Sequence, residues 1–186
     1  MQTAEEIAGF VEQQPEMARL LRLVAQLELP DCWIGAGFIR NAVWDVPHGR
    51  VPDCALLNDV DVVFFDRADA DASRDRAIEL ALAARAPGVP WSVKNQARMH
   101  VKNNEAPYLD ARSAIARWPE TATAVAARLA NGRVELLAPH GIDDLVGLIV
   151  RPTPAFAARR DEVIRRVASK DWLARWPKLR IVDLQQ

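Results

Sequence analysis

The chain has 186 residues, of which 50% are hydrophobic and 26% are charged, and its formal net charge is −1. This composition is typical of a single compact domain that buries a core without disulfide support. The N-terminal segment is acidic, and no later stretch reaches the roughly 20 apolar residues of a membrane span, so we expect neither a secreted nor a membrane protein. Two cysteines, Cys32 and Cys54, favour a cytoplasmic location.

The first third of the chain predicts two helices followed by a strand, a glycine turn and a third helix. A capping box at residues 3–6 begins the first helix, and Pro15 begins the second. Residues 32–34 are apolar and predict a short buried strand, which leads into Gly35-Ala36-Gly37. The apolar residues that follow have helical spacing, so the turn lies at a strand-to-helix junction.

The middle of the chain predicts a strand, a helix and another strand. Residues 59–66 are β-branched and aromatic enough for a central strand. A helix is expected over residues 73–86 and a strand over residues 91–95. Residues 96–113 are polar and fit no regular element.

The C-terminal third predicts a helix from Pro119 that ends at Asn131-Gly132, and then a strand at residues 134–138. We expect residues 155–186 to be a helical extension of a single domain that covers residues 1–186. A small mixed sheet flanked by helices gives an α/β or α+β fold.

The glycine turn is the first candidate for a functional site. Without side chains, Gly35 and Gly37 let backbone N–H groups approach an anion, and the helix N-terminus adds partial positive charge. Arg40, one turn into the helix, could add a guanidinium. Glycine turns before helices also occur for packing reasons alone, so this pattern by itself is weak.

A pair of acids in the central strand is the second candidate. Side chains alternate along a strand, so Asp59 and Asp61 point to the same face, with Cα atoms roughly 6.5 Å apart. Two carboxylates so placed can hold Mg²⁺ ions for phosphoryl transfer. The alternative is an exposed pair that only caps the strand edge.

Together these features resemble the nucleotidyltransferase superfamily, which includes DNA polymerase beta and the tRNA CCA-adding enzymes. A closer resemblance is to a small bacterial nucleotidyltransferase-like family, formerly a domain of unknown function. It rests on segments 35–41, 59–63, 95–100, 118–125 and 141–145. The resemblance implies a minimal nucleotidyltransferase fold without a fingers domain.

The resemblance also implies roles for the candidate residues. Gly35 and Gly37 would cradle the triphosphate of an NTP, and Arg40 would bind the leaving pyrophosphate. Asp59 and Asp61 would hold Mg²⁺ or Mn²⁺. The implied reaction is transfer of an NMP group to a hydroxyl of an acceptor, which could be a small molecule, a protein or RNA.

Two departures from the superfamily pattern leave the activity open. Asn41 stands where CCA-adding enzymes have Asp, and the third strand offers Lys94 and Asn95 where active members have a third carboxylate. Asn41, Lys94 and Asn95 could instead contact the nucleotide, and Glu135 or Glu105 could supply the missing acid. The alternative is a nucleotide-binding or regulatory module with impaired catalysis.

The C-terminal segment is basic, since residues 157–180 have a net charge of +5. A solvated helix face is one explanation, and a phosphate-rich or protein partner lying over this segment is another. The six tryptophans are expected to be core or docking anchors rather than a base-stacking platform.

Overall fold

The computed structural model describes residues 1–183, so the last three residues of the predicted 155–186 extension lie outside the described residues. The helices are α1 (Ala4–Gln13), α2 (Pro15–Ala25), α3 (Gly37–Asp45), α4 (Ala72–Arg85), α5 (Met99–Asn103), α6 (Ala111–Ile115), α7 (Asp143–Val146), α8 (Arg160–Ser169) and α9 (Trp172–Arg175). The strands are β1 (Trp33–Gly35), β2 (Val60–Phe64), β3 (Trp91–Asn95), β4 (Ala126–Ala130), β5 (Arg133–Leu137), β6 (Ile149–Val150) and β7 (Arg180–Ile181).

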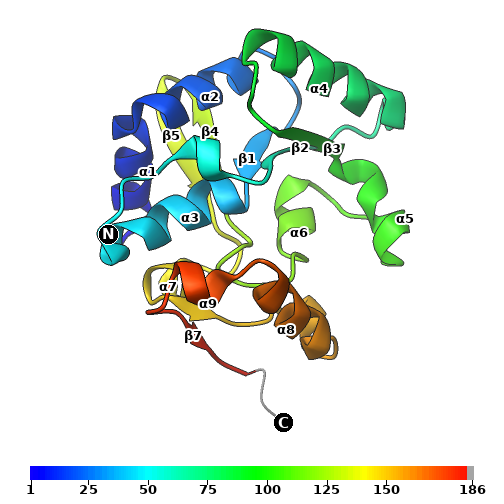
Figure 1. Cartoon of the computed structure of the whole chain (residues 1–186). Helices are drawn as coiled ribbons and strands as arrows, with labels where there is room; N and C mark the ends of the chain where they lie inside the picture. The colour runs from blue at the N-terminus through cyan, green and yellow to red at the C-terminus, as the bar shows by residue number, and fades with distance from the viewer. Residues whose placement is uncertain (184–186) are drawn as a thin grey trace.

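The central sheet has five strands in the order β3-β2-β1-β4-β5, and helices flank it, as predicted for an α/β fold (Figure 1). β1 is antiparallel to both β2 and β4, and β4 and β5 form an antiparallel hairpin. β2 and β3 are parallel, and α4 forms the crossover that a parallel pair requires. The register places Gly35 opposite Asp61, so the end of β1 lies directly beside the acid of β2.

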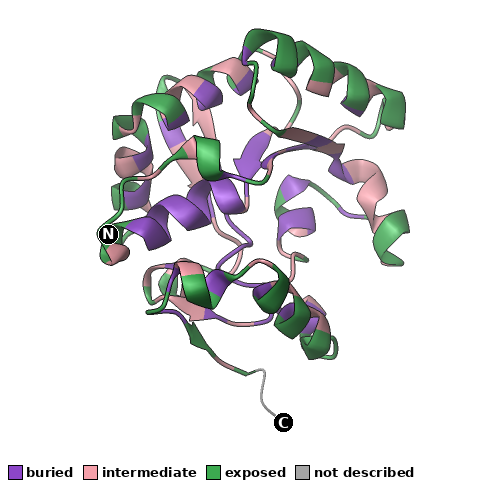
Figure 2. Ribbon diagram, in the orientation of Figure 1, coloured by how far each residue is buried: buried purple, intermediate pink, exposed green. Residues whose placement is uncertain are grey.

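The two faces of the sheet have different coverings. Residues paired across strands share a face, so Trp33 lies with Val63 and Asp61, whereas Ile34 and Val62 lie on the other face. The face with Ile34 and Val62 belongs to the main core, to which α1 to α4 contribute. α6 packs on the face with Trp33 and Val63. Buried residues concentrate in the strands and in α3 (Figure 2).

The first half of the chain follows the sequence prediction. The Thr3 side chain accepts a hydrogen bond from the Glu6 backbone N–H, and Pro15 occupies the first turn of α2. The predicted strand at residues 91–95 coincides with β3, and the predicted central strand is observed at residues 60–64. Local signals are therefore sufficient to define these elements.

The predicted helix from Pro119 to Asn131-Gly132 is wrong. Residues 126–130 form β4, which pairs with both β1 and β5 inside the sheet. Asn131 and Gly132 have φ values of 50° and 76°, as in a two-residue hairpin turn. The alanine content of this segment favours a helix in isolation, but pairing with two neighbouring strands overrides that preference.

Residues 96–113, which no sequence pattern assigned, form a 3₁₀ turn and the short helices α5 and α6. A capping box between Asp110 and Ser113 begins α6. Ala111 and Ile115 of this helix pack against the sheet. This segment therefore covers part of the face on which Asp61 lies.

The C-terminal elements dock onto α3 through tryptophans. Trp44 of α3 makes edge-to-face contacts with Trp172 and Trp176, with ring centroids 5.5 and 5.2 Å apart. The Trp176 Nε1 donates a hydrogen bond to the Asp45 carboxylate at 2.7 Å. These tryptophans are packing anchors, and they bring α8 and α9 beneath the sheet (Figure 1). Among residues 1–183, no helix combines the length and the apolar character needed to cross a membrane.

Candidate active site

A polar cleft of about 250 Å³ opens where β1 and β2 lie beside the first turn of α3. We call one part of its lining the sheet wall, which consists of Ala36, Gly37, Asp59 and Asp61. The other part, the C-terminal wall, consists of Arg166, Lys170, Trp172, Arg175 and Trp176. Arg40, Asn41 and Thr123 also line the cleft. Acidic and basic groups from distant parts of the chain thus meet in one cavity.

The turn between β1 and α3 is held by backbone hydrogen bonds and is strained at Ala36. The φ of Ala36 is 53°, a left-handed value that costs a residue other than glycine about 1 kcal/mol or more. Its N–H donates to the Val125 carbonyl at 2.9 Å, and its carbonyl accepts from the Arg40 N–H at 3.0 Å. The helix N-terminus at this turn therefore lines the cleft and favours an anion there.

The two glycines of the turn have different surroundings. A Cβ at Gly35 would lie 2.5 Å from Cη2 of Trp118 and 3.3 Å from the Val125 carbonyl oxygen. Gly35 therefore makes room for Trp118, and it is not among the residues that line the cleft. A Cβ at Gly37 would be in ordinary contact with the Arg40 guanidinium at 3.5 Å, and Gly37 does line the cleft.

The acid pair lies in the cleft. Asp61 belongs to β2, and Asp59 immediately precedes this strand. Burial, and secondly the charge of Asp59, raise the pKa of Asp61 to about 6, while Ser92, Lys170 and Arg40 oppose this rise. The pair therefore carries negative charge that its surroundings only partly compensate.

Such a pair suits a hard divalent cation. Mg²⁺ prefers carboxylate oxygens, keeps several waters, and takes further ligands from substrate phosphates. Within residues 1–183, no group of three or more His, Cys, Asp and Glu side chains could hold a metal ion. Asp59 and Asp61 can therefore offer two protein ligands, and a cation between them would relieve their mutual repulsion.

Arg40 is almost fully buried, with 5% of its surface exposed. It donates from Nη1 to Thr123 Oγ1 at 2.9 Å and from Nη2 to Asn41 Oδ1 at 2.8 Å. Burial lowers its pKa to about 10, and Glu120 is the acid that most opposes this change. Its Nε has no hydrogen-bond partner in the described part of the chain. Its guanidinium also lies 4.3 Å from the ring centroid of Trp172.

Asn95 lies apart from the acid pair. It pairs with Phe64 in the sheet, which places it on the face opposite Asp61. Its buried amide donates to the carbonyls of Asp66 and Asp69 at 2.7 and 3.0 Å. The structure therefore does not bring Asn95 into the cleft or beside Asp61.

A second cavity of about 380 Å³ shares Asp61 with the cleft. Lys94 lines this second cavity, and its Nζ donates a hydrogen bond to Glu79 at 3.1 Å. Glu105 also lines it and is therefore the only one of the two suggested replacement acids that shares a cavity with Asp61. Glu135 lies on β5, three strands away from β2 in the sheet order.

The residues of the C-terminal wall were not among the predicted site residues. Arg166 and Lys170 come from α8 and its end, and Arg175 from α9. Their signal in the sequence was the net charge of residues 157–180, but a charge count gives no direction for the side chains. Docking of Trp172 and Trp176 on α3 turns these cations into the cleft.

Glu120 is a further residue that sequence analysis missed. It is fully buried, and its Oε1 accepts a hydrogen bond from Arg166 Nε at 2.9 Å. Its Oε2 has no partner among residues 1–183. Glu120 lies in the segment that was predicted as a helix, and only the observed chain path brings it between Arg166 and Arg40.

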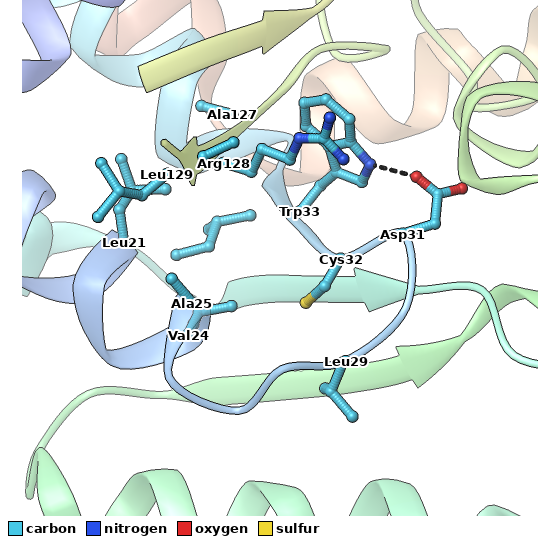
Figure 3. Close-up of a pocket in the computed structure, with 12 residues that line it drawn as sticks. Leu21, Val24, Ala25, Leu29, Asp31, Cys32, Trp33, Ala127, Arg128 and Leu129 are labelled. Carbon is cyan, nitrogen blue, oxygen red and sulfur yellow. Dashed lines mark hydrogen bonds between the residues drawn. The ribbon is translucent and has the colours of Figure 1, made fainter. Parts of the chain in front are cut away.

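A cavity of about 200 Å³ between α2 and the strands β1 and β4 has different chemistry (Figure 3). Its lining is largely aliphatic, with Cys32, whose thiol pKa burial raises to about 12. The polar groups there bind one another: Trp33 Nε1 donates to Asp31 at 2.8 Å, and Arg128 stacks on the Trp33 ring. The cleft with the acid pair is therefore the better candidate for an active site.

Comparison with known proteins supports this choice. A solved structure described as an NMR structure that reveals a CCA-adding enzyme head domain is 32% identical, with a TM-score of 0.85, and the match covers 97% of this chain and 96% of that one. A CCA-adding enzyme in complex with CTP is 17% identical with a TM-score of 0.55. The Thermotoga maritima CCA-adding enzyme complexed with tRNA is 15% identical with a TM-score of 0.56.

The last two matches cover 97% of this chain but only 43% and 42% of the solved chains, so they show similarity of fold alone. No curated protein matches the chain. A family model described as "Nucleotidyltransferase" matches residues 22–181, which include both walls of the cleft. The chain therefore belongs to this nucleotidyltransferase family and has the fold of a CCA-adding enzyme head domain.

Proposed function

We propose that the protein is a Mg²⁺-dependent nucleotidyltransferase that transfers an NMP group from an NTP to a hydroxyl. The observation that carries this proposal is the cleft itself, in which Asp59 and Asp61 lie with the N-terminus of α3 and four cationic side chains. A triphosphate needs a divalent cation, backbone N–H donors and positive charge, and these groups offer carboxylate ligands for the cation together with the donors and the positive charge.

In this mechanism the acid pair holds Mg²⁺ or Mn²⁺, which supplies Lewis-acid stabilisation of the charge that develops on the phosphoryl oxygens. The first turn of α3, at Gly37, donates backbone N–H groups to a phosphate. Arg40, fixed by Thr123 and Asn41, adds positive charge at the base of the cleft. The buried setting strengthens these interactions because water screens them less.

The second cavity is the proposed entrance for the acceptor. In-line displacement requires the attacking oxygen and the leaving pyrophosphate on opposite sides of the phosphorus. If the pyrophosphate lies in the cleft, the hydroxyl approaches Asp61 from the second cavity. Glu105 and Lys94 line this cavity and are candidates for activating or binding the acceptor.

The solved neighbours support a nucleotide substrate, because two are CCA-adding enzymes in complex with CTP and with ATP. The proposal does not specify which molecule carries the acceptor hydroxyl: a small molecule, a protein or RNA. The cytoplasmic location expected from the cysteines likewise remains a prediction.

A catalytically impaired nucleotide-binding module is the second candidate. The observation that favours it is the pairing of Glu105 in the second cavity, where it accepts from the Tyr108 hydroxyl at 2.5 Å and lies 3.7 Å from Arg117. An acid held in this way is less available to activate a hydroxyl.

The test is a titration with Mn²⁺, followed by transfer from an α-labelled NTP to RNA, protein and small-molecule hydroxyls. We expect Mn²⁺ binding and transfer by the unaltered protein, and loss of both in Asp61→Asn. Asp161→Asn, an exposed acid of α8, is the matched control and should change neither. Nucleotide and Mn²⁺ binding without transfer to any acceptor would favour the binding module, and Mn²⁺ binding unchanged in Asp61→Asn would overturn the metal assignment.

A further inference from the structure

The indole of Trp118 occupies the position that a side chain at residue 35 would fill. A Cβ at Gly35 would lie 2.5 Å from Cη2 and 2.9 Å from Cζ3 of this ring. Gly35 pairs with Asp61 across antiparallel strands, and directly paired residues project from one face of a sheet with Cβ positions roughly 5 Å apart. The six-membered ring of Trp118 therefore stands beside Asp61 on the same face.

Trp118 differs in exposure from the tryptophans that dock the C-terminal elements. Those rings are at most 2% exposed, whereas Trp118 is half-buried and lines the second cavity together with Asp61. Trp118 also packs against the small core cluster that includes Trp33 and Val63. It therefore combines an anchored ring with surface at a cavity, which is what base stacking on a protein requires.

Amide groups in the second cavity complement an aromatic surface. The cavity has a volume of about 380 Å³, within the range of small-molecule sites. Gln96 lines it and donates from Nε2 to the Lys94 carbonyl at 3.1 Å. Asn103 also lines it and donates from Nδ2 to the Tyr108 hydroxyl at 2.9 Å. The amide nitrogens thus bind the protein, and the amide oxygens can accept from the N–H groups of a base.

Cations at the same cavity favour an anionic group on the ligand. Lys102 is exposed, and Arg117 lies 3.7 Å from Glu105, a long contact for an ion pair. Lys102 and Arg117 line the second cavity and are not among the residues that line the cleft. Ammonium and guanidinium groups suit phosphate oxygens. A planar base that carries a phosphate fits this combination, whereas a neutral sugar would use neither the ring nor the cations.

We infer that Trp118 is a stacking platform for the base of a nucleotide acceptor, which enters the second cavity and presents its hydroxyl towards Asp61. This inference rests on the proposed function, in which the pyrophosphate lies in the cleft and the acceptor comes from the second cavity. It narrows the acceptor to a nucleotide, either free or at the end of a strand. It also gives Gly35 a role, because a side chain there would displace the ring from its place beside Asp61.

The probe is AMP, titrated into the full-length protein with tryptophan fluorescence and calorimetry as readouts. Adenine stacked on the indole should quench part of the emission. Trp118→Phe should abolish this quenching yet weaken binding less than about threefold, because an aromatic ring remains. Trp118→Leu should weaken binding about tenfold through loss of the stack. Ribose 5-phosphate, which lacks the base, should bind equally to all three proteins.

Two control variants locate the bound AMP. Trp91 is also half-buried but pairs with Val60 on the opposite face of the sheet, so Trp91→Phe should retain both the quenching and the affinity. Lys102→Gln should weaken AMP and ribose 5-phosphate alike, because it removes a cation from the second cavity. Arg175→Gln alters the cleft alone and should leave the affinity for AMP unchanged.

Quenching that persists in Trp118→Phe would overturn the inference, as would equal affinity for AMP in the unaltered protein and Trp118→Leu. A loss in Arg175→Gln without one in Lys102→Gln would also overturn it, because AMP would then occupy the cleft. Thermal melts identify a variant that fails to fold, and quenching in Trp118→Phe then decides. A short oligoadenylate in place of AMP distinguishes a strand end from a free nucleotide, and absence of binding by both overturns the inference.

Failure of the proposed function gives a different result. In that case Mn²⁺ binding and transfer are absent in the unaltered protein, while AMP still quenches the emission of Trp118. If the inference alone fails, transfer proceeds to a hydroxyl that carries no base, and Trp118→Leu retains the full rate.

Discussion

The two walls of the cleft are built in different ways. The sheet wall is defined by backbone contacts, because the strand register places Gly35 opposite Asp61 and the Ala36 N–H bonds to Val125. The C-terminal wall comes from a segment more than 100 residues later and is positioned by side chains. Trp176, which packs on α3, is the main example.

This difference determines how each wall should respond to substitution. The sheet wall is backed by close packing at Gly35, where an added Cβ must displace Trp118 or the Val125 carbonyl. The C-terminal wall depends on polar contacts such as that between Glu120 and Arg166, so it should respond to changes in charge. Four substitutions test this distinction, ordered by the size of the expected effect.

The largest effect is expected from Gly35→Ala, in the strand that supports the sheet wall. The new Cβ would lie 2.5 Å from Trp118 Cη2 and close to the Val125 carbonyl, and overpacking of this kind costs about 3 kcal/mol. Gly37→Ala meets only ordinary contacts and gains up to about 1 kcal/mol of helix propensity, but should weaken NTP binding. Urea unfolding of both variants measures the difference. Equal stabilities would show that the turn is not rigid.

The next effect concerns Glu120, which supports the C-terminal wall through Arg166. Glu120→Gln keeps the shape but removes a buried charge, and we expect a loss of about 2 kcal/mol in the free energy of unfolding. The control is Glu162→Gln, whose partner Arg159 is exposed, and it should have little effect on the free energy of unfolding. If the two variants lose equal stability, the burial of Glu120 has no energetic role.

A smaller effect is expected from Asp61→Asn, and it depends on pH. Because the folded-state pKa of Asp61 is raised to about 6, its ionisation disfavours the folded state, and this penalty develops as pH rises from about 4 to 6. In metal-free buffer at pH 7.5, the variant should be about 1–2 kcal/mol more stable than the unaltered protein. The difference should vanish near pH 4, as measured by urea unfolding across this range. A difference independent of pH would contradict the assignment to this carboxyl.

The smallest effect is expected at Ala36, whose φ of 53° suits glycine better than alanine. Ala36→Gly should stabilise the protein by about 0.5–1 kcal/mol, because relief of strain exceeds the entropic cost of glycine. Ala168→Gly, in the exposed part of α8, should instead destabilise by about 1 kcal/mol. Destabilisation by Ala36→Gly would mean that the turn is not strained.

The sequence by itself determined the features of the site that depend on residues close in sequence, namely the acid pair and the glycine turn. Spacing within one strand is a local property, so Asp59 and Asp61 could be assigned to one face before any neighbour was known. The strand, glycine turn and helix order likewise follows from residues close in sequence, and the family resemblance added the nucleotidyltransferase fold. Even the hairpin at Asn131-Gly132 had a local signal, although the alanines before it favoured a helix.

Only the tertiary structure decided what faces the acid pair. The register between β2 and β3 placed Asn95 on the opposite face from Asp61, and no pattern within a single strand contains that information. Docking of tryptophans turned Lys170 towards the cleft, and the chain path before β4 buried Glu120 beside Arg166. These contacts join residues distant in sequence, so they depend on packing and burial in the whole chain rather than on local propensity.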